Sequence, residues 1–433
     1  MIAEKPGFPC DRRGNRDLSR RAMGKHILIR YPPFPSQTER RIVVRRTQIL
    51  LFFGGVACMA MATGVHDSIF NNFLSDTFAM SAEARGWLEL PRETPGFLVF
   101  LTAGLLAALP VTRVGVVGAA TFGAGMLGLG LIGHRFGWMM AAMLVGSTGL
   151  HLLQPIGSSI AIGLSDETRR GRRMGQMGAV DTMAAVLGTG LVWMTFDKAS
   201  PQYRTGFFIA AALGAMACVF YSMMHVPHLH KPRARMVVRQ KYWLYYLLEL
   251  VFGARKQIFI TFGPWVLIKV YDEPAAAIAG LLMIAALIGI VFKPLAGMAV
   301  DRFGERAVMM ADGLSLIVVC IGYGYAMRLT SNPEQARLLA CGCFIADNLL
   351  FALGSARAIY VSRIAESPQE LTSTLAVGIS VNHIVSMTIP AVAGAIWIGF
   401  GYERVFACAA VLALGHALLA TRVPGRSKRQ QTA

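Results

Sequence analysis

Charged residues lie inside long apolar stretches of this chain, where they are costly and commonly serve to bind or relay charge. The embedded acids and bases that stand out are Asp67, Glu89, Arg92, Glu93, Asp181, Glu249, Arg255, Lys256, Lys293, Asp347 and Arg357. Acids and bases occur in similar numbers, and an unpaired buried charge is strongly disfavoured. We therefore expect many of these side chains to form ion pairs.

The first two apolar stretches carry charges near the end at which they are joined. Glu89, Arg92 and Glu93 have the spacing of residues that share one face of a helix, and Asp67 lies at the same depth on the preceding stretch. We expect these four residues to form one polar cluster. The sequence leaves open whether this cluster contacts a ligand or only forms a structural network that closes this end.

Three other apolar stretches carry polar groups near their centres. The residues concerned are His151, Gln154, Glu249, Arg255, Lys256, Asp347, Asn348 and Arg357. Adjacent positions of a helix point about 100° apart, so only one of Arg255 and Lys256 should face a cavity. That residue can act as the counter-charge for an anion, unless Glu249 or Asp347 neutralises it.

Some embedded groups can carry protons. Burial disfavours the charged form of a carboxyl group, so Asp67, Asp181 and Asp347 are candidates for binding a proton near neutral pH. His383 is an embedded histidine that either carries a proton or only forms a hydrogen bond in the packed interior.

The elements that must position these residues follow from composition. Hydrophobic residues make up 55% of the 433 residues, charged residues make up 15%, and the mean hydropathy is +0.51, which excludes an ordinary soluble enzyme, a disordered chain and a small secreted scaffold. Twelve apolar stretches are each near the length that a helix needs to cross a bilayer. They span 47–73, 87–110, 115–133, 138–163, 174–196, 205–225, 242–269, 275–300, 307–328, 338–360, 374–397 and 402–421. The predicted fold is an all-α membrane protein with twelve transmembrane helices.

The longest polar interruption divides the helices into two groups of six. The expected organisation is a basic cytoplasmic tail, an N-terminal six-helix bundle, a cytoplasmic linker, a C-terminal six-helix bundle and a second cytoplasmic tail, at 1–46, 47–225, 226–241, 242–421 and 422–433. The first tail has no apolar core of the signal-peptide kind, and translation can start at Met1 or Met23.

Lysine and arginine are distributed unequally between the two sides of the predicted membrane. If the N-terminus is cytoplasmic, the inner segments hold 29 of these residues and the outer loops, to which Arg85 is assigned, hold 8. This asymmetry predicts that both termini are cytoplasmic, in a plasma membrane or a bacterial inner membrane. It also explains the net charge of +18 without nucleic acid, and no basic–aromatic patch supports nucleic-acid binding.

A charged turn follows the eighth predicted helix. It reads Gly297-x-x-x-Asp301-Arg302-x-Gly304-x-Arg306, and the corresponding turn after the second helix has Thr112 in place of the acid. In this position the motif resembles the cytoplasmic signature of the major facilitator superfamily. The resemblance covers roughly residues 47–421, mainly as topology. It implies that the two bundles are pseudo-symmetric and that Asp301 closes the cytoplasmic gate at the start of the fifth helix, near Met174; the alternative is a plain charged turn.

The resemblance also implies a function. Helices 1, 4, 7 and 10 of this family tend to line a central cavity, and transport proceeds by alternating access. We therefore expect a monomeric, proton-coupled secondary transporter of a small polar solute, preferably anionic. No phosphate-binding Gly-x-x-x-x-Gly-Lys-Ser/Thr loop or His-x-x-x-His motif occurs, so we predict no ATP-driven pump, cofactor or metal.

Three alternatives stay open. An efflux transporter for amphipathic compounds would have mutually paired cavity charges and a lining rich in aromatic residues and methionine. A polytopic membrane enzyme would need two or three of His66, His151 and His383 to converge with carboxylates at one depth. A non-transporting receptor can share the same fold.

Overall fold

The structure is a computed structural model that describes residues 37–106, 109–165, 170–197, 201–225 and 238–425. All regular secondary structure in these ranges is helical. The chain divides into two units, Met1–Val43 and Val44–Ala433, and every contact described below lies within the second. Most of the two predicted tails and of the predicted linker lie outside the described residues.

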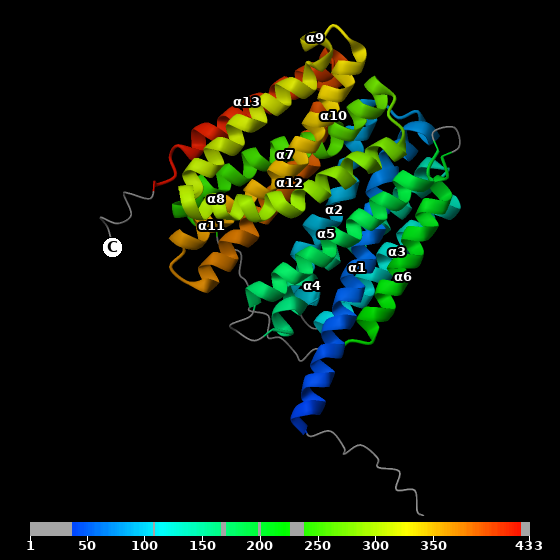
Figure 1. Cartoon of the computed structure of the whole chain (residues 1–433), viewed down its shortest axis with the longest axis vertical. Coiled ribbons are helices and arrows are strands. Elements are labelled where there is room, and N and C mark those ends of the chain that lie inside the picture. Colours follow the sequence, from blue (N-terminus) through cyan, green and yellow to red (C-terminus); the bar gives the residue numbers. More distant parts are fainter. Residues whose placement is uncertain (1–36, 107–108, 166–169, 198–200, 226–237, 426–433) are drawn as a thin grey trace, which may run out of the picture. The chain divides into compact units, whose positions relative to one another are not determined.

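Six long helices form the first half of the larger unit, and the first of them begins before that unit does. They are α1 (Gln37–Phe78), α2 (Ala82–Leu106), α3 (Val111–Ile132), α4 (Phe136–Gly163), α5 (Arg170–Thr195) and α6 (Tyr203–Ser222). Figure 1 shows α3 beside α6, and α3 packs closely on both α4 and α6. Gly125 and Gly149 let the backbones of α3 and α4 approach each other, because a β-carbon on either would collide with the facing main chain.

The second half repeats this pattern with more interruptions. Its helical elements are η2 (Gln240–Tyr242), α7 (Trp243–Tyr271), α8 (Ala275–Gly324), α9 (Ala326–Leu329), α10 (Pro333–Leu350), η3 (Phe351–Gly354), α11 (Ser355–Ile364), α12 (Pro368–Phe400) and α13 (Tyr402–Ala420). Gly304 has φ +81° and ψ 162°, so α8 is two helices that meet at this residue. A side chain is strained in that conformation, which explains a glycine in the charged turn.

Local sequence signals fix the starts of α10 and α12. The side chain of Asn332 accepts a hydrogen bond from the Glu334 N–H at 2.8 Å, and that of Ser367 accepts one from the Glu370 N–H at 3.2 Å. In both helices a proline directly follows the capping residue, at a position where its missing N–H costs no hydrogen bond.

The described helices match the twelve predicted membrane crossings. Nine of them, counted by length and composition within the described ranges, are long and apolar enough to cross a membrane. That count treats α8 as one helix and omits α2 and α7, which carry the embedded charges Arg92 and Lys256. With α8 divided at Gly304, and with α10, η3 and α11 taken as one interrupted crossing, each predicted stretch is occupied by a helix.

The two halves meet mainly through α2 against α12 and α5 against α8. We call the end at which α1 finishes and α2 starts the far end, and the opposite end the near end. At the far end Gly86 of α2 packs directly on the Pro390 carbonyl, and Gly394 of α12 packs on the Ala82 carbonyl. Also at this end, Asn72 donates a hydrogen bond to the Glu273 carbonyl at 3.0 Å.

The contact between α5 and α8 is also made at the far end. Gly280 lies under the Trp193 ring, and Gly190 lies near the Met283 sulfur. Toward the near end, β-carbons built on Gly178 of α5 and Gly297 of α8 would meet no described atom within 4 Å outside their own helical turns. The close glycine contacts between the two halves therefore lie at the far end, and Lys293 Nζ of α8 donates to Thr182 Oγ1 near the middle of α5 at 3.4 Å.

Candidate functional site

A cavity of about 830 Å³ lies between the two halves. Its wall is formed by side chains from both of them, mainly from α1, α2, α4, α7, α10 and α12. The predicted site residues that line it are Asp67, Arg92, Glu93, His151, Gln154, Glu249, Lys256, Asp347, Asn348 and His383. Glu89, Asp181, Arg255 and Arg357 do not belong to this lining. The structure thus brings most of the predicted residues to one place.

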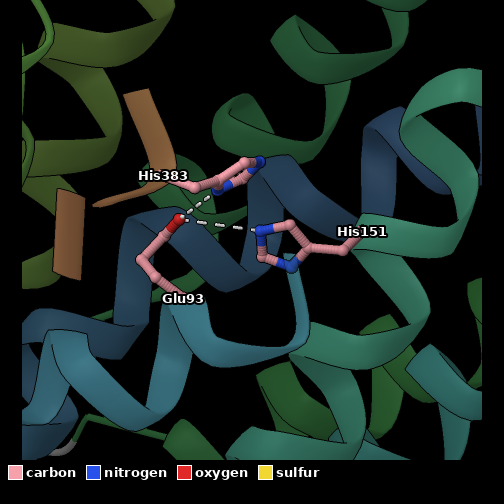
Figure 2. A group of neighbouring side chains, drawn as sticks. All are labelled: Glu93, His151 and His383. Carbon is pink, nitrogen blue, oxygen red and sulfur yellow. Dashed lines mark hydrogen bonds and ion pairs between the residues drawn. The ribbon is translucent and has the colours of Figure 1, made fainter. Parts of the chain in front are cut away.

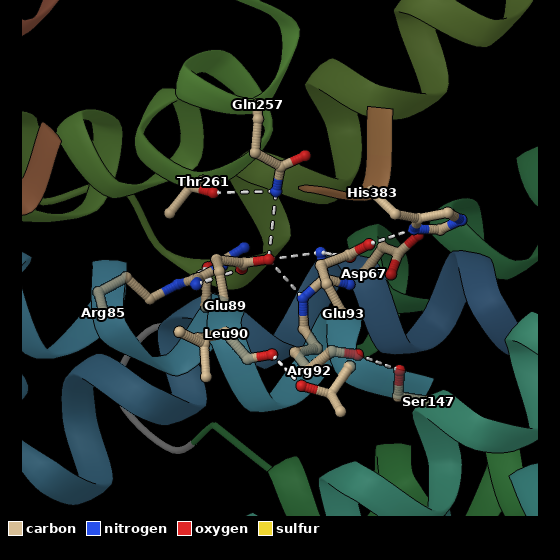
Figure 3. A network of polar contacts seen from close by, with 12 residues as sticks. Asp67, Arg85, Glu89, Leu90, Arg92, Glu93, Ser147, Gln257, Thr261 and His383 are labelled. Carbon is tan, nitrogen blue, oxygen red and sulfur yellow. Dashed lines mark hydrogen bonds and ion pairs between the residues drawn. The ribbon is translucent and has the colours of Figure 1, made fainter. Parts of the chain in front are cut away.

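Charged residues of α2 form a continuous ion network at the far end of the cavity (Figure 3). Arg92 Nη2 lies 2.6 Å from Glu89 Oε2 and 2.6 Å from Glu93 Oε1. Arg85 Nη1 lies 2.5 Å from Glu89 Oε1, and Gln257 Nε2 of α7 donates to Glu89 Oε2 at 3.2 Å. Three members of the expected cluster therefore interact directly, and the network reaches into the other half.

Asp67, the fourth expected member, lies beside this network without an ion pair to its arginines among the described contacts. Asp67 Oδ1 lies 2.9 Å from His66 Nδ1, and 64% of the aspartate side chain is exposed. Its carboxylate therefore lines the cavity in contact with solvent.

Two arginines of the second half are neutralised by acids of the same half. Arg255 pairs with Asp347, and both side chains are 2% exposed. Arg357 Nε lies 2.8 Å from Glu249 Oε1, and its guanidinium carbon lies 3.4 Å from the centre of the Phe252 ring. Arg255 therefore follows the alternative that the sequence left open, in which an acid neutralises it.

Lys256 has the opposite environment from its sequence neighbour. It lines the cavity, and its Nζ donates a hydrogen bond to Asn382 Oδ1 at 2.7 Å. No carboxylate lies within 4 Å of this ammonium group in the part of the chain that the structure describes. The predicted divergence of adjacent helical positions thus separates a paired arginine from a lysine that faces the cavity.

Glu93, His151 and His383 converge at the wall of the cavity (Figure 2). Glu93 Oε2 lies 3.6 Å from His151 Nε2 and 3.3 Å from His383 Nδ1. Gly96 makes this possible, since a β-carbon there would lie 2.6 Å from both the His151 Nε2 and the His383 Cε1 atoms. We call these three side chains the Glu93 trio.

The convergence partly meets the geometric condition set for a membrane enzyme, because two of the three named histidines meet one carboxylate. His66 lies apart from them and stacks on Phe70 at a ring-centre distance of 4.8 Å. His151 Nδ1 lies 2.9 Å from the Ser147 carbonyl oxygen, which fixes the ring. Among the described residues, the Ser147 hydroxyl, 3.2 Å from His151 Nδ1, is the only serine or cysteine side chain that forms a hydrogen bond with the trio.

Two groups of buried charged residues were missed by the sequence analysis. Arg85 was assigned to an outer loop, but α2 begins at Ala82, so Arg85 is a buried helical residue; its spacing of four residues from Glu89 was the available signal. Asp312 and His416 are both buried, and Asp312 Oδ2 lies 3.8 Å from His416 Nδ1. Neither residue was among the embedded residues singled out from the sequence.

The charged turn after the eighth crossing is a real helix break. Beside Gly304, the buried Glu305 Oε1 lies 3.0 Å from Arg363 Nε, which ties the turn to the end of α11. Residues 166–169, which precede α5, lie outside the described residues. The contact of Asp301 with the start of α5 stays a prediction.

Comparison with known proteins identifies the class. A model of the Major Facilitator Superfamily matches residues 52–366, so the chain belongs to this superfamily of membrane transporters. The predicted resemblance is thereby confirmed, and the chain is a multi-pass membrane protein with the fold of a transporter.

Solved structures with the same fold are those of transporters for different solutes. A crystal structure of the nucleoside transporter NupG has a TM-score of 0.69 at 14% identity and covers 88% of this chain and 98% of its own. The crystal structure of a D-xylose-proton symporter has a TM-score of 0.65 at 15% identity and covers 90% of this chain and 99% of its own. The crystal structure of a POT family transporter in complex with 5-aminolevulinic acid has a TM-score of 0.69 at 12% identity and covers 86% of this chain and 95% of its own. At these identities the likeness shows the fold alone, and no curated protein matches the chain.

Proposed function

We propose that this protein is a secondary active transporter that moves a small anionic organic solute by alternating access. The observation that carries the proposal is the position of Lys256, a cation that faces a cavity between two helical halves and has no carboxylate partner among the described residues. An ammonium group without a carboxylate in direct contact is costly at this depth, and a bound anion would offset that cost.

The rest of the cavity suits a solute with several polar groups. Gln154, Asn348 and Asn382 place amide groups on the wall from α4, α10 and α12, and the volume of about 830 Å³ is in the range of pockets for small organic ligands. Amides can donate and accept hydrogen bonds, whereas Lys256 supplies the attraction for a carboxylate or phosphate.

The contacts between the halves support an inward-facing state. The far end is closed by α2 on α12 and by α5 on α8, and toward the near end Gly178 of α5 and Gly297 of α8 have open space beside them. With both termini in the cytoplasm, this is an inward-facing arrangement. Transport then requires the halves to rock so that the far-end contacts separate and the turn at Asp301 closes against α5.

Protons are the coupling ion in this proposal, and Asp67 is the residue that carries them. Among the three candidate acids, Asp347 is paired with Arg255, and Asp181 is not part of the cavity lining. Asp67 lines the cavity beside His66 and the Arg92 network, so a proton there would alter the charge next to the far gate.

A second candidate function is efflux of amphipathic compounds. Much of the cavity wall is apolar, with aromatic and methionine side chains that include Phe70, Met126, Met143, Phe259 and Phe344. Arg255 and Arg357 are paired with acids, as that function predicts. Lys256 distinguishes the two, because the apolar part of an amphipathic cargo gains nothing from a half-buried ammonium group in the cavity wall.

Flux into proteoliposomes tests both functions. Radiolabelled anionic, neutral and cationic solutes are supplied with and without a pH gradient, and uptake by wild type is compared with Lys256→Gln. The proposal expects gradient-driven uptake of an anion, with KM raised at least tenfold by Lys256→Gln and unchanged by Lys269→Gln, a matched change outside the cavity lining. Flux of amphipathic cations that is indifferent to Lys256 would establish the second function, and absence of flux for every solute would refute both.

A further inference from the structure

We propose that the Glu93 trio binds a divalent transition-metal ion of the zinc class, which bridges the two halves of the protein when bound. The three side chains come from α2, α4 and α12, so the ligands belong to both halves. This site goes beyond the proposed transport function and does not depend on the identity of the solute.

The distances are compatible with a metal ion between the three side chains, and only the contact of His383 with Glu93 is short enough for a direct hydrogen bond. Ligand atoms about 2.0–2.1 Å from a tetrahedral zinc ion lie about 3.4 Å from one another. Glu93 Oε2 lies 3.6 Å from His151 Nε2 and 3.3 Å from His383 Nδ1, and all three ligand atoms lie within 4.8 Å of one another. A separation of 3.6 Å is too long for a hydrogen bond between nitrogen and oxygen.

The neighbours of the trio also orient it for a cation. His151 Nδ1 faces the Ser147 carbonyl oxygen at 2.9 Å, so the proton of the neutral ring lies on Nδ1. The lone pair of Nε2 then points toward the Glu93 carboxylate. Two facing lone pairs repel each other, and a metal ion between them would turn that repulsion into two bonds. A backbone carbonyl behind a ligating histidine is a common support in metal sites.

Arg92 holds the carboxylate without occupying the ligand atom. Its Nη2 contacts Glu93 Oε1 at 2.6 Å, which leaves Oε2 directed at both imidazole rings. The positive charge of Arg92 is shared with Glu89, whose carboxylate lies 2.6 Å away. Two imidazoles and one carboxylate are a ligand set that favours zinc and similar ions over magnesium or calcium. The cavity gives the fourth coordination position access to water or to an anion.

The site lies where the contact between α2 and α12 reaches the cavity, and from there the two helices stay in contact up to the far end. Gly86 contacts Pro390, and seven residues further along each helix toward the cavity Glu93 faces His383. Seven residues of helix span about 10 Å. A metal ion held by these side chains would therefore fasten the far-end contact from the cavity side and oppose the separation that transport requires.

Zinc binding to the purified full-length protein tests the site. Titration calorimetry at pH 7.5 with Zn²⁺ alone should give one equivalent bound by wild type, and His383→Gln or His151→Gln should weaken binding at least tenfold. His66→Gln is the matched control, because this histidine also lines the cavity but lies outside the trio, and it should leave the affinity unchanged. Gly96→Ala should weaken binding as well, since the new methyl group would displace both rings.

Each variant is first shown to elute as a single species in size-exclusion chromatography. If only one of the two histidine variants folds, that variant is sufficient for the binding test. Absence of saturable binding by wild type, or an affinity equal to that of wild type in both His151→Gln and His383→Gln, would overturn the site. Hydrogen exchange tests the bridge: Zn²⁺ should slow amide exchange severalfold in α2 and α12 of wild type but not of His383→Gln. Bound zinc with unchanged exchange in both helices would refute the bridging role.

Discussion

Arg255 and Lys256 are adjacent in sequence but have opposite environments. Arg255 is paired with Asp347 inside the second half, and Lys256 faces the cavity and donates to an amide oxygen of Asn382. The reason is the turn of about 100° between consecutive helical residues. Loss of the charge on Arg255 should therefore lower the stability of the protein, whereas loss of the charge on Lys256 should weaken binding of the solute.

We predict that Arg255→Gln lowers stability because it leaves the buried Asp347 carboxylate unpaired. Breaking a buried ion pair from one side costs about 3–5 kcal/mol. The thermal unfolding midpoint of the detergent-purified protein should fall clearly for Arg255→Gln and little for Lys256→Gln. The double variant Arg255→Gln/Asp347→Asn should recover part of the loss, and a double variant no more stable than the single one would argue against the pairing.

At the scale of elements, the start of α12 depends on a charged cap. Glu370 Oε2 accepts a hydrogen bond from the Glu366 N–H at 3.1 Å, and its Oε1 lies 3.0 Å from Lys241 Nζ. The hydrogen bond from Lys241 is the largest cause that lowers the pKa of Glu370, to about 2. The ordinary value is 4.5, so the cap stabilises the folded state fully above about pH 4.5 and loses this effect as pH falls toward 2.

We predict that Glu370→Gln lowers the unfolding midpoint at pH 6 and that its difference from wild type shrinks between pH 5 and pH 3. The amide cannot lose a proton, so the variant lacks the charge whose stabilisation is pH-dependent. Glu334→Gln, a change in the first turn of α10, serves as a comparison. A difference that stays constant over this pH range would mean that the Lys241 contact does not contribute through charge.

The contact between α2 and α12 depends on small residues. A β-carbon at Gly394 would lie 2.8 Å from the Ala82 carbonyl oxygen, whereas one at Gly399 of the same helix would meet no described atom within 4 Å. We predict that Gly394→Ala weakens closure of the far end, with a cost of about 1–3 kcal/mol, and that Gly399→Ala has little effect. Labelling of an engineered cysteine near Ala82 from the far side measures closure, and equal labelling of the two variants would contradict this assignment.

At the scale of the whole transport unit, the two halves carry unequal gate motifs. The turn at Gly304 retains Asp301, whereas the corresponding turn of the first half has Thr112. We predict that Asp301→Asn slows transport several-fold more than Thr112→Ala, because only the acid can stabilise the near-end closure at a helix N-terminus. Initial uptake rates at matched expression decide this point, and equal rates would contradict an asymmetric gate.

Much of the architecture was already determined by the amino-acid sequence. Hydropathy fixed the number of crossings because each membrane helix must bury its own backbone polar groups, and this requirement is local. Helical spacing was also sufficient to predict the Glu89–Arg92–Glu93 grouping and the divergence of Arg255 from Lys256. The start of α2 was misplaced because charged residues such as Arg85 resemble a loop in a hydropathy profile, although a partner in the next turn buries them.

Only the tertiary structure decided which distant residues meet. Glu93 and His383 are 290 positions apart, and no periodicity relates them. Their contact depends on the crossing of α2 and α12, which the backbone approaches at Gly86 and Gly394 set. Likewise, the sequence offered both Glu249 and Asp347 as partners for the basic residues, and packing assigned one acid to each buried arginine and none to Lys256. Short-range helix geometry is encoded residue by residue, whereas such long-range pairing follows from how whole helices fit together.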